Sequence, residues 1–173
     1  EGGVFTDLLA SNGYSASNTL ALNAIKLLSE DDLEKAEKSA KQSLDMSDKV
    51  SPKPRLAMYK LYKYKFNKSG STDHLSIAMK HLEIAIDSGL ASPAIYRLLS
   101  EEYANKRNYT EAIGLLEDAG SRFENKQEHY PLLTKYYYEL GDTKKAQDIY
   151  SSCINAVVPA IRTKCIEVKA AYN

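Results

Sequence analysis

Hydrophobic and small residues of this chain follow helical spacing and recur at a fixed period. Ala78, Ala112 and Ala146 lie 34 residues apart, and each is followed four residues later by a large residue and seven residues later by a small one. These following pairs are Leu82 with Ala85, Leu116 with Ala119, and Tyr150 with Cys153. Because steps of three and four residues place side chains on one face of a helix, the pattern predicts three equivalent helices.

A second helical pattern precedes each of the last two alanine helices. Its positions are large, large, small and tyrosine: Tyr96, Leu99, Ser100 and Tyr103, then Tyr130, Leu133, Thr134 and Tyr137. Between the paired helices, "NKRN" ends at Asn108 and "LGD" contains Gly141 and Asp142. Glycine or asparagine just past a helix supplies a C-cap, and Asp or Asn before the next helix supplies an N-cap. We therefore expect each unit of 34 residues to be a helical hairpin.

This order of side-chain sizes resembles the tetratricopeptide repeat. The resemblance implies an all-α fold, a right-handed superhelical array of antiparallel helix hairpins with about four repeats in a single domain, 1–173. The segments are an N-terminal helix at 1–16, repeats at 17–50, 53–90, 93–126 and 127–160, and a C-terminal capping helix at 159–173. The match is best from residue 93 onward.

Several segments depart from the repeat pattern. The N-terminal helix is expected to end at Asn12 and Gly13, and in the first repeat Ala40 occupies the place of a large residue. In the second repeat, "PRLAMYKLYKYKF" fits more than one helical register, and "NKSGSTDH" adds residues to the expected hairpin loop. Pro159 is expected to begin the terminal helix.

Three consecutive tyrosines, Tyr136 to Tyr138, precede the "LGD" turn. Successive helical residues point about 100° apart. We expect Tyr137 in the core, with its hydroxyl bonded to water or a backbone carbonyl, Tyr136 toward a neighbouring helix, and Tyr138 on the inner wall of the array. Ala146 is expected to be small because the two helices of its hairpin cross closely there.

The resemblance also implies a function. In tetratricopeptide arrays the first helices of successive hairpins line a concave groove that holds an extended peptide or a partner helix. The corresponding residues are Lys60, Tyr64, Asn67, Arg97, Glu101, Ala104, Asn105, Lys135, Tyr138, Glu139, Arg162 and Lys169. Cations and amides bind carboxylate and backbone groups, and tyrosine rings stack on side chains. The alternative is that these residues are simply exposed positions of a scaffold.

One specialised form of this groove does not fit the sequence. The subfamily that grips chaperone C-termini uses lysine, asparagine and arginine at fixed groove places. Here Lys60 fits one place, but the others hold Tyr64, Leu98, Glu128 and Leu132. We therefore expect a non-catalytic protein–protein interaction module that is not a chaperone-tail clamp.

Composition limits the partners. The chain has 23 basic and 23 acidic residues without a long run of one sign, which disfavours nucleic acid as the partner. No apolar run approaches the roughly 20 residues of a membrane span, so we expect no direct membrane insertion. Another protein or a peptide segment remains as the expected partner, and the sequence leaves the oligomeric state open.

Catalytic and metal-binding patterns are not found in the sequence. His74, His81 and His129 lack further ligands at metal-site spacings, and no zinc-peptidase, nucleophile-elbow or P-loop motif occurs. We expect no enzyme, no cofactor, and a solvated pair at His74 and His81. The acidic "SEDDLE" segment is expected to cap a helix. Cys153 and Cys165 are expected to be either buried free thiols or a disulfide that indicates an oxidising compartment.

Two other functions are consistent with the pattern. "TDLLASNGYSA" is similar to a segment that follows the zinc-binding core in some bacterial membrane-associated metallopeptidases with C-terminal repeats. That similarity implies an accessory region of a larger enzyme, a periplasmic or other extracytoplasmic location and a disulfide between Cys153 and Cys165. The other function is a self-assembling structural protein. The chain begins without methionine, which is typical of a processed protein or a fragment.

Overall fold

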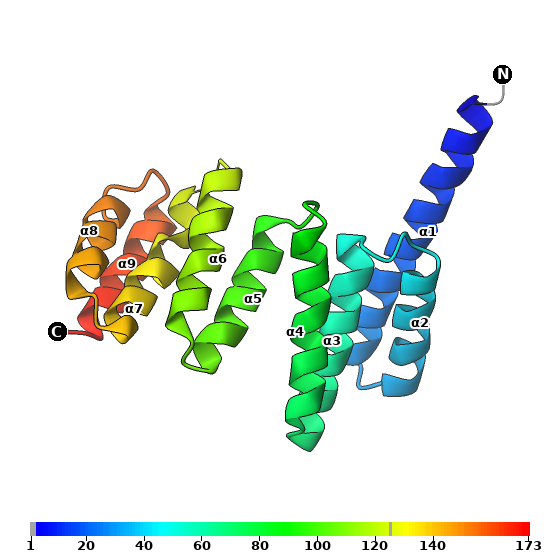
Figure 1. Cartoon of the computed structure of the whole chain (residues 1–173), viewed down its shortest axis with the longest axis horizontal. Coiled ribbons are helices and arrows are strands. Elements are labelled where there is room, and N and C mark those ends of the chain that lie inside the picture. The colour runs from blue at the N-terminus through cyan, green and yellow to red at the C-terminus, as the bar shows by residue number, and fades with distance from the viewer. Residues whose placement is uncertain (1–2, 125) are drawn as a thin grey trace. The chain divides into compact units, whose positions relative to one another are not determined.

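The computed structural model describes residues 3–124 and 126–173, with side chains from residue 16 onward. Within these residues the chain is all-helical and contains no strand (Figure 1). The elements are α1 (Gly3–Ser29), α2 (Leu33–Asp45), α3 (Pro52–Ser69), α4 (Thr72–Asp87), α5 (Pro93–Asn105), α6 (Tyr109–Arg122), η1 (Lys126–His129), α7 (Tyr130–Leu140), α8 (Thr143–Cys153) and α9 (Pro159–Ala170). They form two compact units, Glu1–Ile95 and Tyr96–Asn173. The predicted single superhelical array of four repeats stays a prediction.

The first unit is built from α1 to α4, with α1 against α2 and α3, and α3 against α4. Its core contains Ala21, Ala24, Ala40, Ala57, Met58 and Leu61. Two reciprocal hydrogen bonds join α1 to α2: the Ser17 hydroxyl donates to the Ser43 carbonyl at 2.8 Å, and the Ser43 hydroxyl donates to the Ser17 carbonyl at 2.6 Å. Small residues are suited to this interface because two helix backbones approach within reach of a serine side chain.

Helix lengths in the first unit differ from the prediction. Helix α1 continues through Asn12 and Gly13 to Ser29, so the predicted break there is wrong. A glycine inside a helix costs only about 1 kcal/mol, and the helix-forming residues that follow offset it. The residues predicted to enlarge the α3–α4 loop lengthen both helices instead, because α3 ends at Ser69, Gly70 adopts a left-handed conformation with φ 70°, and α4 begins at Thr72.

The second unit shows the burial that its sequence pattern predicts. Ala112, Leu116, Ala119, Ala146 and Cys153 are fully buried. Helices α5 and α6 approach closely, because the Ser100 hydroxyl donates to the Ala112 carbonyl at 2.8 Å. A larger side chain at Ala112 or Ala146 would therefore overpack the contact between helices.

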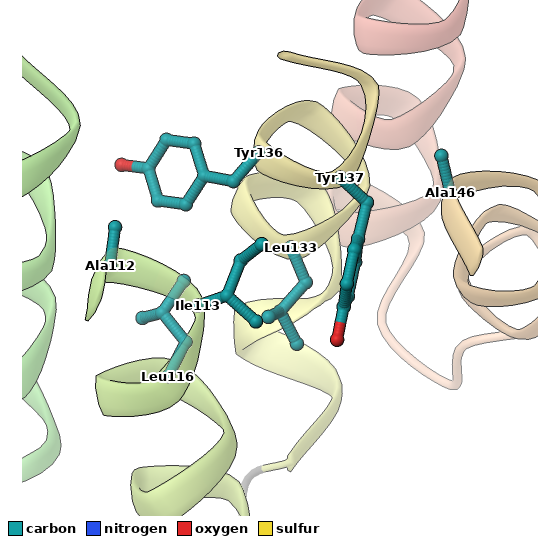
Figure 2. Packing of buried hydrophobic residues seen from close by; sticks show 7 residues of the cluster. All are labelled: Ala112, Ile113, Leu116, Leu133, Tyr136, Tyr137 and Ala146. Atoms are coloured by element: carbon teal, nitrogen blue, oxygen red, sulfur yellow. The ribbon is translucent and has the colours of Figure 1, made fainter. Parts of the chain in front are cut away.

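The three adjacent tyrosines of α7 have different environments. Figure 2 shows Tyr136 directed to the side of Ala112 and Tyr137 to the side of Ala146. The ring centroid of Tyr136 is 6.0 Å from that of Tyr109, as expected for a contact with a neighbouring helix. Tyr137 is buried as predicted, but its hydroxyl donates to the Glu117 carboxylate at 2.5 Å, so the predicted water or carbonyl partner is wrong. A long acidic side chain on α6 reaches the phenol more readily than a backbone carbonyl already engaged in a helix.

Of three residues that the sequence suggests as N-caps, two accept a side-chain cap hydrogen bond and one does not. The Asp32 and Asp142 side chains accept hydrogen bonds from the backbone N–H of Lys35 and Lys145, at 3.2 and 3.0 Å, which confirms the capping interpretation of "SEDDLE". Gly141 is left-handed with φ 88°. Asn108 occupies the N-cap of α6 without a side-chain cap bond.

The C-terminal helix α9 begins at Pro159 as predicted and is covalently joined to α8. Cys153 and Cys165 form a disulfide with a Cα–Cα distance of 6.3 Å, and both are fully buried. The Arg162 guanidinium donates to the carbonyls of Ala156 and Val157 at 2.6 and 3.2 Å. The disulfide and this arginine together fix the α8–α9 turn.

Candidate functional site

A hollow of the second unit lies among α5, α7 and α9 and has a volume of about 740 Å³. Its lining combines apolar side chains with a rim of charged side chains of both signs. The apolar and aromatic lining residues are Pro131, Leu132, Val168, Ala171 and Tyr172; the charged ones are Arg97, Glu101, Glu128, Lys135, Lys164 and Glu167. A lining of apolar side chains with a few polar groups is typical of a ligand site.

A second hollow of about 420 Å³ adjoins the first. The two share Glu101, Leu132 and Lys135, and therefore form one continuous surface. The remaining lining residues of the second hollow are Ala104, Asn105, Tyr109, Tyr136 and Glu139. We call the two together the groove.

The charges at the groove rim are available to a ligand. Within the residues that the structure describes, the six charged side chains of the first hollow have no oppositely charged partner within 4.0 Å. Elsewhere in the chain such pairs do form, for example Lys65 with Glu37 at 2.9 Å and Arg122 with Asp118 at 2.9 Å. A ligand that brings complementary charges would therefore displace no ion pair of the protein itself.

Helix α9 is held against α7 by an aromatic contact at the edge of the groove. The rings of Tyr138 and Tyr172 stack with centroids 4.8 Å apart and planes 10° from parallel, and Lys169 Nζ lies 5.2 Å from the Tyr138 centroid. The Tyr172 hydroxyl donates to the Glu139 carboxylate. Burial, followed by this hydrogen bond, raises the pKa of Tyr172, and burial and the charge of Glu101 raise the pKa of Tyr136 to about 12.

Six of the twelve predicted groove residues line this surface: Arg97, Glu101, Ala104, Asn105, Lys135 and Glu139. Tyr138 lines neither hollow and instead supports Tyr172 from beneath. Arg162 is also outside both, since its guanidinium holds the α8–α9 turn. The structure thus brings half of the predicted set together.

Lys60 and Tyr64 belong to the first unit. They line a separate hollow of about 340 Å³ with residues of α1 and α3, namely Ile25, Leu28, Ser29, Tyr59, Lys63 and Asn67. The Tyr64 hydroxyl donates to Asp31, whose pKa is lowered mainly by that hydrogen bond and by Lys68. Tyr64 is therefore already engaged within its own unit.

The sequence prediction placed Arg162 and Lys169 of α9 along the groove, but neither lines it. The 34-residue spacing from Arg97 and Pro131 leads to Cys165 on α9. Cys165 is fully buried in the disulfide, so α9 presents Lys164, Val168 and Ala171 to the groove instead.

The histidines of the first unit are not a solvated pair. The nitrogen atoms His81 Nδ1 and Arg55 Nη1 are 2.8 Å apart, and the Tyr62 ring stacks on His81 with centroids 5.8 Å apart. Burial, and then the Arg55 charge, lowers the pKa of His81 to about 4. Partial burial between two helices explains the difference from the prediction. Among the described residues, no group of three or more His, Cys, Asp or Glu side chains could hold a metal ion.

His129 is fully buried beside the groove, and neither ring nitrogen has a hydrogen-bond partner among the described residues. Burial, and then the charge of Arg97, lowers its pKa, while Glu128 opposes the shift. As the pH falls below the ordinary histidine pKa of about 6.5, the unfolded chain therefore gains a proton that the folded chain resists. The free energy of unfolding should decrease with acidification until the lowered folded-state pKa is reached.

Replacing His129 with leucine should stabilise the protein by about 1 to 3 kcal/mol, because it removes buried nitrogen atoms without partners. It should also flatten the acid-induced loss of stability below about pH 6.5. Urea unfolding across this pH range tests both results, and His74→Gln serves as the control because it leaves both His129 and His81 in place. A leucine variant that is less stable than the wild type at pH 7 would contradict the interpretation.

No described helix combines the length and apolar character that a membrane crossing requires. Comparison with protein-family models gives no match, and comparison with curated proteins gives none of significant similarity. The resemblances to tetratricopeptide repeats and to the repeat regions of bacterial metallopeptidases stay predictions.

Proposed function

We propose that the chain is a non-catalytic interaction module whose groove in the second unit binds a linear segment of another protein. The observation that carries the proposal is the continuity of the two hollows through Glu101, Leu132 and Lys135. A surface that runs from one hollow into the next fits an extended peptide better than a compact small molecule.

The chemistry of the lining supports a peptide. The apolar side chains of Leu132 and Val168 can bury a hydrophobic side chain, and the rim offers unpaired charges of both signs. Asn105 and the partly buried Tyr109 provide donors and acceptors for a peptide backbone. Apolar anchors in pockets contribute most of the affinity in such interfaces, while the polar rim sets orientation.

Selection from a display library of random linear peptides should yield binders, and these should bind a groove variant more weakly. Arg97→Ala/Lys135→Ala removes two rim cations, and we expect at least about a tenfold loss of affinity, equal to 1.4 kcal/mol. The matched control is Lys106→Ala/Lys144→Ala, which also removes two exposed cations but changes no residue of the groove.

Fluorescence anisotropy with the selected peptides measures both variants, and circular dichroism verifies that each is folded. Equal binding by the groove variant and the control would contradict the proposal, as would a selection that enriches no peptide.

A further inference from the structure

The second hollow differs chemically from the first. Glu101 and Glu139 contribute two carboxylates, Tyr109 and Tyr136 contribute two aromatic rings, and Asn105 contributes an amide. Lys135 is the one cation that lines it, and Lys135 also lines the first hollow, where Arg97 and Lys164 are. Negative charge and aromatic surface therefore predominate in the second hollow.

These carboxylates lack a cationic partner in the protein. Neither Glu101 nor Glu139 forms an ion pair with a lysine or arginine of the described chain. The Tyr172 hydroxyl donates a hydrogen bond that holds the Glu139 carboxylate in place. Because this hydroxyl is neutral, the negative charge of Glu139 remains uncompensated. An oriented carboxylate loses little conformational entropy when it binds a ligand cation.

The aromatic rings complete the environment of a cation. Tyr136 is almost entirely buried and packs beside the partly buried Tyr109, with centroids 6.0 Å apart and planes inclined by 41°, so Tyr109 is the ring that a ligand cation can contact. A ring face attracts a lysine ammonium or an arginine guanidinium, and the aliphatic part of either side chain packs on apolar surface. Carboxylates and tyrosine rings around one hollow thus complement a basic side chain better than an acidic or a neutral one.

We propose, on the basis of the proposed function, that the second hollow binds a lysine or arginine side chain of the peptide while a neighbouring apolar side chain of the same peptide occupies the first hollow. Leu132 lies at the junction of the two hollows, so both anchors come from nearby positions of one extended segment. The specificity is therefore for an apolar residue and a basic residue close together in sequence.

The test uses a selected peptide and two protein variants. Glutamine is substituted for each lysine or arginine of the peptide in turn, and binding is measured to the wild type, to Glu101→Gln/Glu139→Gln, and to the control Glu111→Gln/Asp148→Asn. Glu111 and Asp148 are exposed and line neither hollow. Glutamine retains an acceptor for the Tyr172 hydroxyl, so the wall of the groove is preserved.

We expect one basic position of the peptide to be essential: its replacement should weaken binding to the wild type and to the control about tenfold. The same replacement should have little further effect on the Glu101→Gln/Glu139→Gln variant, because the interaction is already lost there. Binders without lysine or arginine, or equal effects on all three proteins, would overturn this inference while leaving the proposed function intact.

The remaining outcomes concern the groove itself. If no peptide binding depends on Arg97 and Lys135, the proposed function fails together with the inference. If sedimentation shows self-association that the Glu101→Gln/Glu139→Gln variant abolishes, a second copy of the chain is the occupant, and the inference of a basic linear peptide is wrong.

Discussion

Replacement of Cys153 and Cys165 by alanine is expected to lower the free energy of unfolding by about 3 kcal/mol, the effect typical of a disulfide that closes a short loop. The bond joins α8 to α9, and both sulfur-bearing side chains are fully buried. Helix α9 should be held less firmly, because the stack of Tyr138 on Tyr172 and the Arg162 hydrogen bonds remain but the cross-link to α8 is lost. Urea unfolding of the oxidised wild type and of the double variant measures the difference.

The disulfide also has a consequence for binding. Helix α9 and the residues just after it supply Lys164, Glu167, Val168, Ala171 and Tyr172 to the groove. Peptide affinity should therefore fall in the double-alanine variant, although neither cysteine lines the groove. Wild type unfolded in the presence of reductant serves as a second reference for the free energy of unfolding, because reduction breaks the disulfide without changing the sequence. Equal stability of the oxidised protein and the alanine variant would contradict a stabilising role.

Leu116→Ala should have a comparable effect, with an expected loss of about 3 to 4 kcal/mol. Leu116 is fully buried in the cluster drawn in Figure 2, together with Ile113, Leu133 and Tyr137. Removal of its branched end leaves a cavity, because the surrounding helices are fixed by the same cluster.

The neighbouring leucine provides a matched control for this substitution. Leu115 undergoes the same chemical change but is only partly buried, so Leu115→Ala should cost about 1 kcal/mol. Urea unfolding of both variants tests the assignment of the core face of α6. Similar losses for the two leucines would show that the helix is rotated from the described position.

Much of the second unit could be predicted because its signals are local. Alanine at a fixed period indicates where two helices approach closely, and Ala112 and Ala146 are indeed fully buried. Gly141 adopts the left-handed conformation that ends α7, and the Asp142 side chain caps the start of α8, as these residue types predict. These features depend on residues within one or two helical turns.

Other features could not be predicted because they depend on contacts between distant segments. The bond between Cys153 and Cys165 joins α8 to α9, and the sequence left it open. The partner of the Tyr137 hydroxyl is Glu117, twenty residues away on α6. The continuation of α1 through Gly13 shows that a single weak breaker does not end a helix without a suitable turn after it.

The groove was predicted in part for the same reason. Arg97, Glu101, Asn105 and Lys135 are on helices whose register the repeat pattern sets, and they line the groove. Val168 comes from α9 and Tyr172 from the residues just after it, where the pattern no longer applies. The acidic and aromatic character of the second hollow appears only when α5, α6 and α7 are packed together.

The most direct test of peptide binding in the groove is to map the contact surface of a selected peptide by nuclear magnetic resonance of the isotope-labelled chain. The proposal predicts that the largest chemical-shift changes occur at groove residues of α5, α7 and α9, including Glu101, Leu132 and Val168. Changes confined to the first unit, or to the hollow of about 310 Å³ that Leu116, Lys126 and Ile149 help to line, would contradict it.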